Sequence, residues 1–340
     1  MARAWPDAPI FTALYDRGAV GDLFPAERVH ASYIAHLPLA NRYFRYYAPL
    51  YPGAFERFDL SAYDLIISST SAWAKGVHFR SDAKHVCFIH TVSRFLFDYQ
   101  RYVGALRHVQ GDRIPDWLAR PMIDRLIAWD IEASTRPTRY IANSEIVAQR
   151  VSDYYDRHAD VLHSPIDVER FTPGRGDGGY FIVASRLLPY KRIDLAIDAA
   201  QLAGVKLIVV GSGPAEAQLR EHAHGTTTTM LGFVSDAEVN RLLGGAIAAI
   251  LPGEEDLGLV PLEAAAAGRP TIAYRGGGAT ETIVEGETGA FFDEVDPESL
   301  ANVLRAFEPL NFDPLRLRAH AERFSPERFI ASFKEIVAAT

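Results

Sequence analysis

Short runs of apolar and β-branched residues alternate with longer amphipathic segments along most of this chain. Before residue 172, five such runs predict strands at 10–15, 63–68, 85–90, 139–142 and 160–163. Between the third and fourth runs, apolar residues at helical spacing predict a helix over 104–135. Strands that alternate with helices in this way are typical of a parallel sheet with helices on both faces.

A second series of strands and helices follows the run 172–179, which contains four glycines and no apolar side chain and therefore predicts a linker. The strands that we predict beyond it lie at 181–184, 206–210, 229–232, 247–251 and 271–274. Helical patterns cover 192–202 and 237–243, and a last amphipathic helix is predicted over 325–339 with Ser325 as its N-cap. The chain is therefore expected to form two doubly wound α/β domains.

Composition and charge narrow the possible functions. The 340 residues carry 35 basic and 43 acidic side chains, and the resulting net charge of −8 argues against a nucleic-acid partner. The single cysteine, Cys87, has no second cysteine with which to form an internal disulfide. We find no signal-peptide pattern and no apolar stretch of membrane-spanning length. We therefore expect a folded cytoplasmic protein, with the inner face of the membrane as an alternative location.

Two segments of the second series carry side chains suited to a nucleotide diphosphate, each at a predicted strand end. In 184–192, Arg186 and Lys191 offer a bidentate fork and a point charge to phosphate oxygens. In 250–270, Glu255 on an acidic loop and Glu263 in the following helix are separated by seven residues. Both carboxylates can accept hydrogen bonds from one hydroxylated ligand. The alternative is that the acidic cluster faces solvent and that Glu263 stabilises the helix dipole.

Two glycine turns and a histidine complete the candidate chemistry. The turns at 211–214 and 275–278 can bring backbone N–H groups close to a phosphate. The first turn lacks the full G-x-G-x-x-G pattern and the acidic residue that holds a dinucleotide ribose, which disfavours a nicotinamide oxidoreductase. His90 ends the most apolar strand, a position that suits a functional histidine as well as a structural one.

Taken together, these motifs resemble the retaining glycosyltransferases of family 4, and most closely the mannosyltransferases of surface-polysaccharide assembly. Residues 185–195, Ser-Arg-Leu-Leu-Pro-Tyr-Lys-Arg-Ile-Asp-Leu, are similar to the family's diphosphate loop, and Glu255 through Glu263 matches its E-x7-E signature. The resemblance implies the GT-B fold, in which two Rossmann-like domains face each other across a cleft. Residues 1–171 would be the acceptor-side domain, 172–179 the linker, 180–322 the nucleotide-sugar-binding domain and 323–340 a helix that crosses back to the first domain.

The resemblance also implies roles for individual residues. Arg186 and Lys191 would bind the donor diphosphate, Glu255 would contact the donor sugar, and His90 would lie over that sugar from the opposite domain; these four are the expected catalytic residues. Other positions are expected to bind the donor, with Glu263 on the ribose hydroxyls: Ser185, Gly211, Val234, Asp256, Leu257, Gly258, Leu259, Val260 and Glu263. Because there is no Asp-x-Asp motif and no cluster of histidine and cysteine ligands, we expect no metal, and no cofactor apart from the donor itself as substrate.

The chain departs from the family pattern in two places. Family members usually have a strand, a glycine-rich loop and a helix ahead of the segment that reads here as 5–16. We therefore expect the first domain to lack its usual first strand and glycine loop, because the start is truncated, the sheet is rearranged or another segment replaces them. The 340 residues are expected either to pair the neighbouring strands directly or to borrow a strand from a second copy. Residues 90–94 read His-Thr-Val-Ser-Arg where close relatives have His-Thr-Pro-Met-Arg, and this difference concerns the acceptor.

The expected reaction is transfer of a hexose with retention of configuration, from a nucleotide sugar to a glycan or lipid-linked sugar. GDP-mannose is the first choice of donor, with UDP- and ADP-sugars as alternatives. Segment 37–58 interleaves arginines with aromatic residues, a composition suited to peripheral membrane contact, although aromatics at such spacing also form cores. The alternative function is a degenerate, non-catalytic sugar-nucleotide-binding protein.

Overall fold

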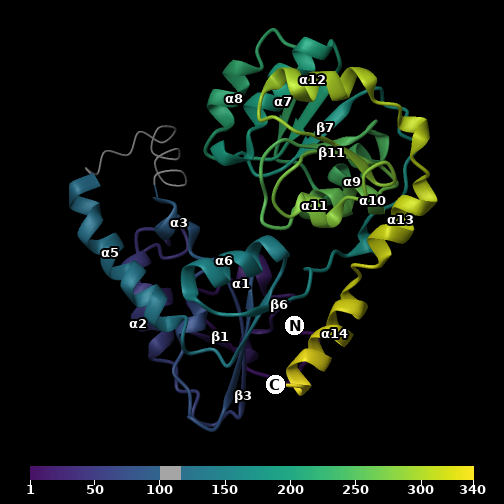
Figure 1. The fold of residues 1–340 in the computed structure, drawn as a ribbon. Coiled ribbons are helices and arrows are strands. Elements are labelled where there is room, and N and C mark those ends of the chain that lie inside the picture. The colour runs from purple at the N-terminus through teal and green to yellow at the C-terminus, as the bar shows by residue number, and fades with distance from the viewer. Residues whose placement is uncertain (100–115) are drawn as a thin grey trace.

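The computed structural model describes residues 1–99 and 116–340, which form two α/β lobes (Figure 1). The predicted helix over 104–135 lies partly outside these residues, and its described part is α5, Asp116–Ala133. The elements before residue 172, which we call the N-terminal half, are β1 (Ile10–Thr12), α1 (Arg17–Val20), β2 (Val29–Ala31), α2 (Tyr51–Glu56), β3 (Leu65–Thr70), β4 (Lys84–Ile89), α3 (Arg94–Phe97), α5, β5 (Arg139–Ala142), α6 (Glu145–Tyr155) and β6 (Ala159–Val161).

The remainder of the chain, which we call the C-terminal half, contains the larger sheet. Its elements are β7 (Phe181–Ala184), α7 (Ile193–Ala203), β8 (Leu207–Val210), α8 (Glu216–His222), β9 (Thr228–Gly232), α9 (Asp236–Gly245), β10 (Ala249–Leu251), α10 (Leu259–Ala266), β11 (Thr271–Tyr274), α11 (Ala279–Thr282), β12 (Gly289–Phe292), α12 (Pro297–Ala306), α13 (Pro314–Glu322) and α14 (Pro326–Ala338).

The larger sheet is doubly wound and entirely parallel, with the strand order β12-β11-β10-β7-β8-β9. From β7 the chain builds outward through β8 and β9, then returns to place β10 on the other side of β7. The order therefore reverses between β7 and β10, and the loops after these two strands diverge from that point. Ligands of open α/β sheets bind at such a switch point.

Apolar side chains on both faces of this sheet hold the C-terminal half together. Phe181 and Val183 point into a core shared with α7 and α12, whereas Ile182 points into a second core shared with α9, α10 and α13. The alternation along β7 follows from the two-residue period of a strand. Because both faces are covered by helices, the strand is apolar at every position.

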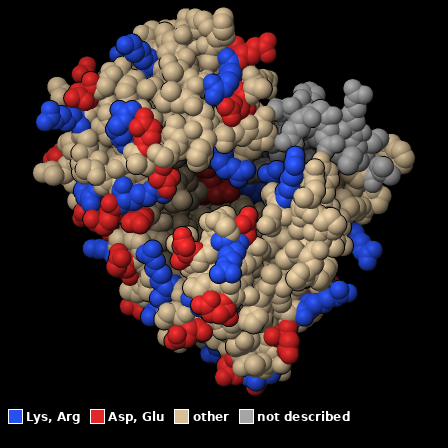
Figure 2. All heavy atoms as spheres, turned by 180° about the vertical axis from the view of Figure 1, so that it is seen from behind, with Lys and Arg blue, Asp and Glu red and all other residues tan. Residues whose placement is uncertain are grey.

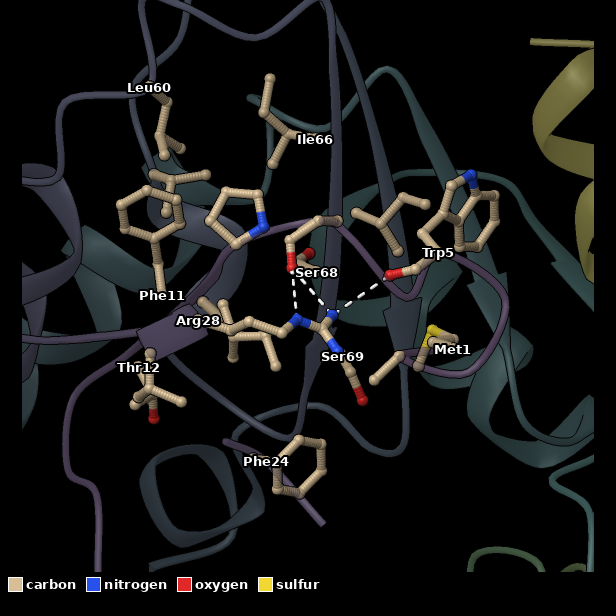
Figure 3. A pocket seen from close by; sticks show the side chains of 18 of the residues that line it. Met1, Trp5, Phe11, Thr12, Phe24, Arg28, Leu60, Ile66, Ser68 and Ser69 are labelled. Atoms are coloured by element: carbon tan, nitrogen blue, oxygen red, sulfur yellow. Dashed lines mark hydrogen bonds between the residues drawn. The ribbon is translucent and has the colours of Figure 1, made fainter. Parts of the chain in front are cut away.

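The N-terminal half contains two separate parallel sheets, one of order β3-β4-β5-β6 and one of β1 and β2 alone. In the described residues β1 and β2 do not pair with β3. Of the two expected outcomes, direct pairing of the neighbouring strands is therefore wrong, and a strand from a second copy stays a prediction. Packing of side chains in a shared cluster, which includes Ile34, Phe55 and Ile66, holds the two sheets together instead. A hollow of about 520 Å³ remains between β1 and β3, lined mainly by apolar side chains (Figure 3).

Helix α14 leaves the C-terminal half and packs on the sheet of the N-terminal half (Figure 1). Phe329 and Phe333 are buried against Phe88 of β4, with ring centroids 5.4 and 6.0 Å from that of Phe88. The Ser325 hydroxyl accepts from the N–H of Arg328 and begins the helix. Helix α14 therefore forms part of the core of the N-terminal half.

Segment 172–179 is bound to the C-terminal half. The N–H groups of Gly174, Gly176 and Gly178 donate to the carbonyl oxygens of Ala267, Gly244 and Gly245, at 2.9–3.0 Å. A Cβ atom on Gly174 would lie 2.2 Å from the Gly244 carbonyl oxygen. These glycines are thus required for close backbone packing.

Candidate functional site

The candidate site lies at the switch point of the larger sheet, where the loops after β7 and β10 leave adjacent strands. The starts of α3 and α6, both in the N-terminal half, contact the loop after β10 through Arg94 and Ser144. Figure 2 shows the surface hollowed between the two lobes, with basic and acidic side chains gathered there. Elements that carry predicted site residues in both halves therefore meet at one cleft.

The loop after β7 carries the two cations predicted to bind phosphate. Arg186 is exposed and forms no ion pair within the described ranges 1–99 and 116–340. Lys191 ends a short 3-10 helix that leads into α7. Gly211 has a φ of +130°, and a Cβ atom there would lie 1.8 Å from the Ser185 carbonyl oxygen. The first glycine turn is therefore required for its packing against the cation loop.

The loop after β10 carries the acidic cluster. Glu255 forms an ion pair with Lys191, so the structure joins the two loops that flank the switch point. Gly258, with a φ of +73°, is the N-cap of α10 and has no side chain that could accept the first N–H groups of the helix. Leu259 is the exposed first residue of α10, and Val260, which follows it, is partly buried. Among the described residues, no side chain of the N-cap therefore binds the first N–H groups of α10.

The second glycine turn supports the acidic loop from the side. The Gly278 N–H donates to the Glu255 carbonyl oxygen at 2.9 Å. Cβ atoms on Gly277 and Gly278 would lie 2.3 Å from the Glu255 carbonyl oxygen and 2.3 Å from the Cα of the buried Leu257. Only glycine allows this approach, so the turn fixes the position of Glu255.

The carboxyl group of Glu263, on α10, has no hydrogen-bond partner among the described residues. Burial raises the pKa of the Glu263 carboxyl, Asp236 adds to the rise, and Arg170 opposes it. Arg170 and Asp236 are themselves paired at 2.8 Å. Val234, the expected neighbour of the base, lies partly buried two residues before Asp236. A partly buried carboxyl group without a partner is suited to accept hydrogen bonds from a ligand.

His90 lies at the end of β4. Its Nε2 is 2.8 Å from the Ser69 hydroxyl, and burial lowers the pKa of the imidazole, so the ring is neutral at pH 7. The adjacent Thr91 hydroxyl is buried and has no hydrogen-bond partner among the described residues. In the same residues, no hydrogen bond or ion pair joins His90 to Arg186, Lys191 or Glu255.

Asp256, an expected donor ligand, instead points to the N-terminal half. Its carboxylate accepts hydrogen bonds from Arg94 Nη1 at 3.0 Å and from Arg150 on α6. Its carbonyl oxygen accepts from the Ser144 hydroxyl at 2.6 Å, and Arg150 also donates to Glu254 at 3.0 Å. The acidic loop is thus held from the opposite side of the cleft.

Glu281, in α11, makes a second contact between the halves. Its carboxylate accepts from the N–H groups of Glu145 and Ile146 at the start of α6, at 2.8 and 3.3 Å, and lies 2.9 Å from Nε2 of His163. Burial acts to raise the pKa of Glu281, but the hydrogen bonds from His163 and the two N–H groups outweigh it and lower that pKa. The N-terminus of α6 binds this carboxylate as helix N-termini bind anions.

Sequence reasoning assigned no role to Arg94, Arg150 or Glu281. The available local signal was Ser144, an N-cap serine directly after a strand, which marks the start of α6 at the carboxyl edge of the sheet. Contacts between residues more than 100 positions apart leave no such signal.

Within residues 1–99 and 116–340, no three His, Cys, Asp or Glu side chains converge in a way that could hold a metal ion. In the same part of the chain, every helix is too short or too polar to span a bilayer.

The two Rossmann-like lobes, the cleft and the returning C-terminal helix are those of the GT-B fold. Sucrose-phosphate synthase from Thermosynechococcus elongatus shares it with a TM-score of 0.68 at 17% identity, over 92% of this chain and 84% of that structure. HepE from Anabaena, solved with UDP and glucose, has a TM-score of 0.62 at 18% identity, over 92% of this chain and 86% of that structure. The GT-B prediction is confirmed.

Residues 166–324 match the family model of glycosyl transferases group 1. Glycogen synthase 1 from Bradyrhizobium diazoefficiens is 35% identical over 161 residues, 44% of this chain and 35% of that protein. The D-inositol 3-phosphate glycosyltransferase of Mycolicibacterium smegmatis is 30% identical over 211 residues, 54% of this chain and 48% of that protein. The GDP-mannose-dependent alpha-(1-6)-phosphatidylinositol monomannoside mannosyltransferase of the same organism is 29% identical over 234 residues, 57% of each protein. The chain thus spans between about a third and somewhat over half of these relatives.

Proposed function

We propose that this protein is a glycosyltransferase that moves a hexose from a nucleotide sugar to a glycan or lipid-linked acceptor. The observation that carries the proposal is the arrangement at the switch point, where Arg186, the Lys191–Glu255 pair and Glu263 follow adjacent strands. Among the residues that the structure describes, Arg186 forms no ion pair and the Glu263 carboxyl group has no hydrogen-bond partner. These residues lie within the segment that matches glycosyl transferases group 1. A diphosphate needs cations, and a ribose and a sugar need acceptors for their hydroxyl hydrogens.

In the proposed reaction, the bond between the sugar's anomeric carbon and the diphosphate oxygen breaks, and its electron pair leaves with the diphosphate. Arg186 and Lys191 would stabilise the negative charge that develops there. The acceptor hydroxyl would attack from the same face, with retention of configuration, and pass its proton to the departing phosphate oxygen. Neutral His90 would contact the donor sugar from the N-terminal half. Two fixed cations would make a metal ion unnecessary, and no other cofactor is proposed.

For the donor we propose GDP-mannose, with UDP- and ADP-sugars as alternatives. The relative named as a GDP-mannose-dependent mannosyltransferase, 29% identical over 57% of the chain, supports this choice. The similar structure with bound UDP and glucose, at 18% identity, supports the alternative. Family 4 membership and a role in surface-polysaccharide assembly are part of the same proposal.

We further propose that the acceptor is presented at a membrane surface, which segment 39–50 would contact. Five large apolar or aromatic side chains there are at least 38% exposed: Leu39, Tyr43, Phe44, Tyr46 and Leu50. Arg42 and Arg45 lie over the rings of Tyr43 and Phe44, at 5.6 and 4.9 Å from the centroids. Aromatic rings and arginines are typical of proteins that bind the interface of an anionic membrane.

The decisive experiment incubates the purified protein with a panel of GDP-, UDP- and ADP-hexoses and measures release of the nucleoside diphosphate, alongside calorimetric titration of GDP, UDP and ADP. We expect one nucleotide to bind and its sugar to be turned over. Arg186→Met should weaken binding, whereas Lys206→Met, a change at an exposed lysine before β8, should leave binding unchanged. Binding without turnover of any sugar, even with lipid-linked acceptors, would favour the alternative, a non-catalytic sugar-nucleotide-binding protein.

A further inference from the structure

We infer that Asp256, Arg94 and Arg150 form a clasp that holds the acidic loop in its binding position from the opposite half of the protein. Asp256 is thus a positioning residue: it acts through the adjacent Glu255 and does not contact the donor directly. Its consequence for a donor rests on the function proposed above.

The clasp places one carboxylate between two guanidinium groups in a partly buried setting. The side chains of Arg94, Arg150 and Asp256 are 8, 14 and 22% exposed. Ion pairs at the surface contribute little, but removing one partner of a pair this buried leaves the other charge poorly solvated. Arg150 also pairs with Glu254, so the residues on both sides of Glu255 are held by the same arginine.

A buried network fixes both arginines within the N-terminal half. Asp130 of α5 is fully buried and paired with the buried Lys75. It accepts hydrogen bonds from the Ser93 hydroxyl and from the Tyr155 hydroxyl, both at 2.7 Å. Ser93 directly precedes Arg94, and Tyr155 ends α6, the helix that carries Arg150. One carboxylate therefore fixes the two elements from which the clasp arises.

The clasp connects directly to the residues that flank the switch point. Asp256 follows Glu255, which pairs with Lys191 on the loop after β7. The Ser144 hydroxyl holds the backbone of the same loop through the Asp256 carbonyl oxygen. A continuous series of contacts thus runs from the core of the N-terminal half to the cation loop, and releasing Asp256 frees the loop that presents Glu255.

Hydrogen–deuterium exchange on the ligand-free protein tests the clasp without reference to any substrate. In Asp256→Asn and in Arg150→Met, the peptide covering 252–262 should exchange at least about fivefold faster, while the strands β7 and β8 stay protected. The increase in the double variant should be smaller than the sum of the two single increases, because both changes remove the ion pair between Arg150 and Asp256. The control Arg241→Met removes an exposed pair with Glu238 on α9 and should leave the peptide unaffected. Unchanged exchange in both single variants, or additive increases in the double variant, would overturn the inference.

Titration with GDP and UDP then tests what the clasp does for binding. Asp256→Asn should weaken binding of the preferred nucleotide about tenfold, and Asp256→Glu, which keeps the charge, should restore most of it. Wild-type affinity in Asp256→Asn would show that the clasp does not position the site. If the wild-type protein binds no nucleoside diphosphate at all, the proposed function fails, and the exchange result still decides whether the clasp exists.

Discussion

The Lys191 ammonium and the Glu255 carboxylate form an ion pair in which the two side chains are only 16 and 18% exposed. They come from the loops after β7 and β10, the adjacent strands between which the order of the sheet reverses. A cation and an anion at a switch point suit a ligand that carries both phosphate and hydroxyl groups.

Lys191→Ala should lower turnover of the preferred nucleotide sugar by about 10²-fold or more, because in the proposed reaction it would remove a fixed positive charge at the departing diphosphate. Steady-state kinetics and circular dichroism measure the loss and check the fold. Lys206→Ala, in the same half, serves as the matched control. Near-normal turnover in Lys191→Ala would remove this lysine from the mechanism.

Activity should persist in excess EDTA, because in the proposed reaction Arg186 and Lys191 would take the place of a metal at the diphosphate. The measurement is release of nucleoside diphosphate before and after extensive dialysis against the chelator. Complete loss that manganese or magnesium restores would contradict this prediction.

Stability should fall in acid partly through His85. This side chain is fully buried on β4, and burial lowers its pKa to about 3. Below about pH 6.5, the pKa of histidine in the unfolded chain, the unfolded chain binds a proton at His85 that the native protein does not bind. The free energy of unfolding therefore falls by about 1.4 kcal/mol per pH unit, or about 3 kcal/mol at pH 4.5. Urea unfolding at pH 7 and pH 4.5 should show a smaller pH dependence in His85→Gln. An equal pH dependence in both proteins would show that His85 does not contribute.

Phe333→Ala should lower the free energy of unfolding by about 3–5 kcal/mol, because the ring is fully buried against Phe88 and leaves a cavity. Phe333→Leu should cost less. Thermal or urea unfolding measures both, with the exposed Leu310→Ala on the surface of the C-terminal half as a control. An equally small effect of Phe333→Ala and Leu310→Ala would show that α14 is not part of the core.

Vesicle flotation tests the surface formed by 39–50. The protein should float with vesicles rich in phosphatidylglycerol and not with phosphatidylcholine alone, since arginines require anionic headgroups. Replacing Phe44 and Tyr46 by serine should reduce flotation severalfold. Trp117→Ser, at an exposed aromatic residue on α5, is the control.

Much of the fold was predictable because each strand and helix carries its own pattern. Strands β5, β7 and β11 have the predicted bounds, and the doubly wound arrangement follows from alternating strands and helices. Strands β2 and β12 were not predicted. Val29–Ala31 is too short for a recognisable alternation of polar and apolar residues. Gly289–Phe292 begins with glycine and contains only three further residues, which is too short a run to indicate a strand. Local patterns also gave no indication of whether β1 would pair with β3, because that depends on packing between distant segments.

The candidate site was also predictable only in part. Arg186, Lys191, Glu255 and Glu263 could be placed at strand ends from local sequence, and the structure puts the first three on adjoining loops. The pairing of Asp256 with Arg150 could not be predicted, since it joins residues 106 positions apart across a cleft. Their charges alone are equally compatible with solvent-exposed side chains.

The position of α14 has a consequence for the order of events on the ribosome. Strands β4 and β5 are made early, yet the apolar face formed by Val86, Phe88 and Ile141 is covered only when Phe329 and Phe333 have emerged. At a translation rate of about 5–20 residues per second, roughly ten to forty seconds pass between the synthesis of β5 and that of α14, and the face stays exposed for that time. The N-terminal half therefore completes its core only after α14 has been synthesised, and during that interval the nascent protein presents an apolar surface to which a chaperone can bind.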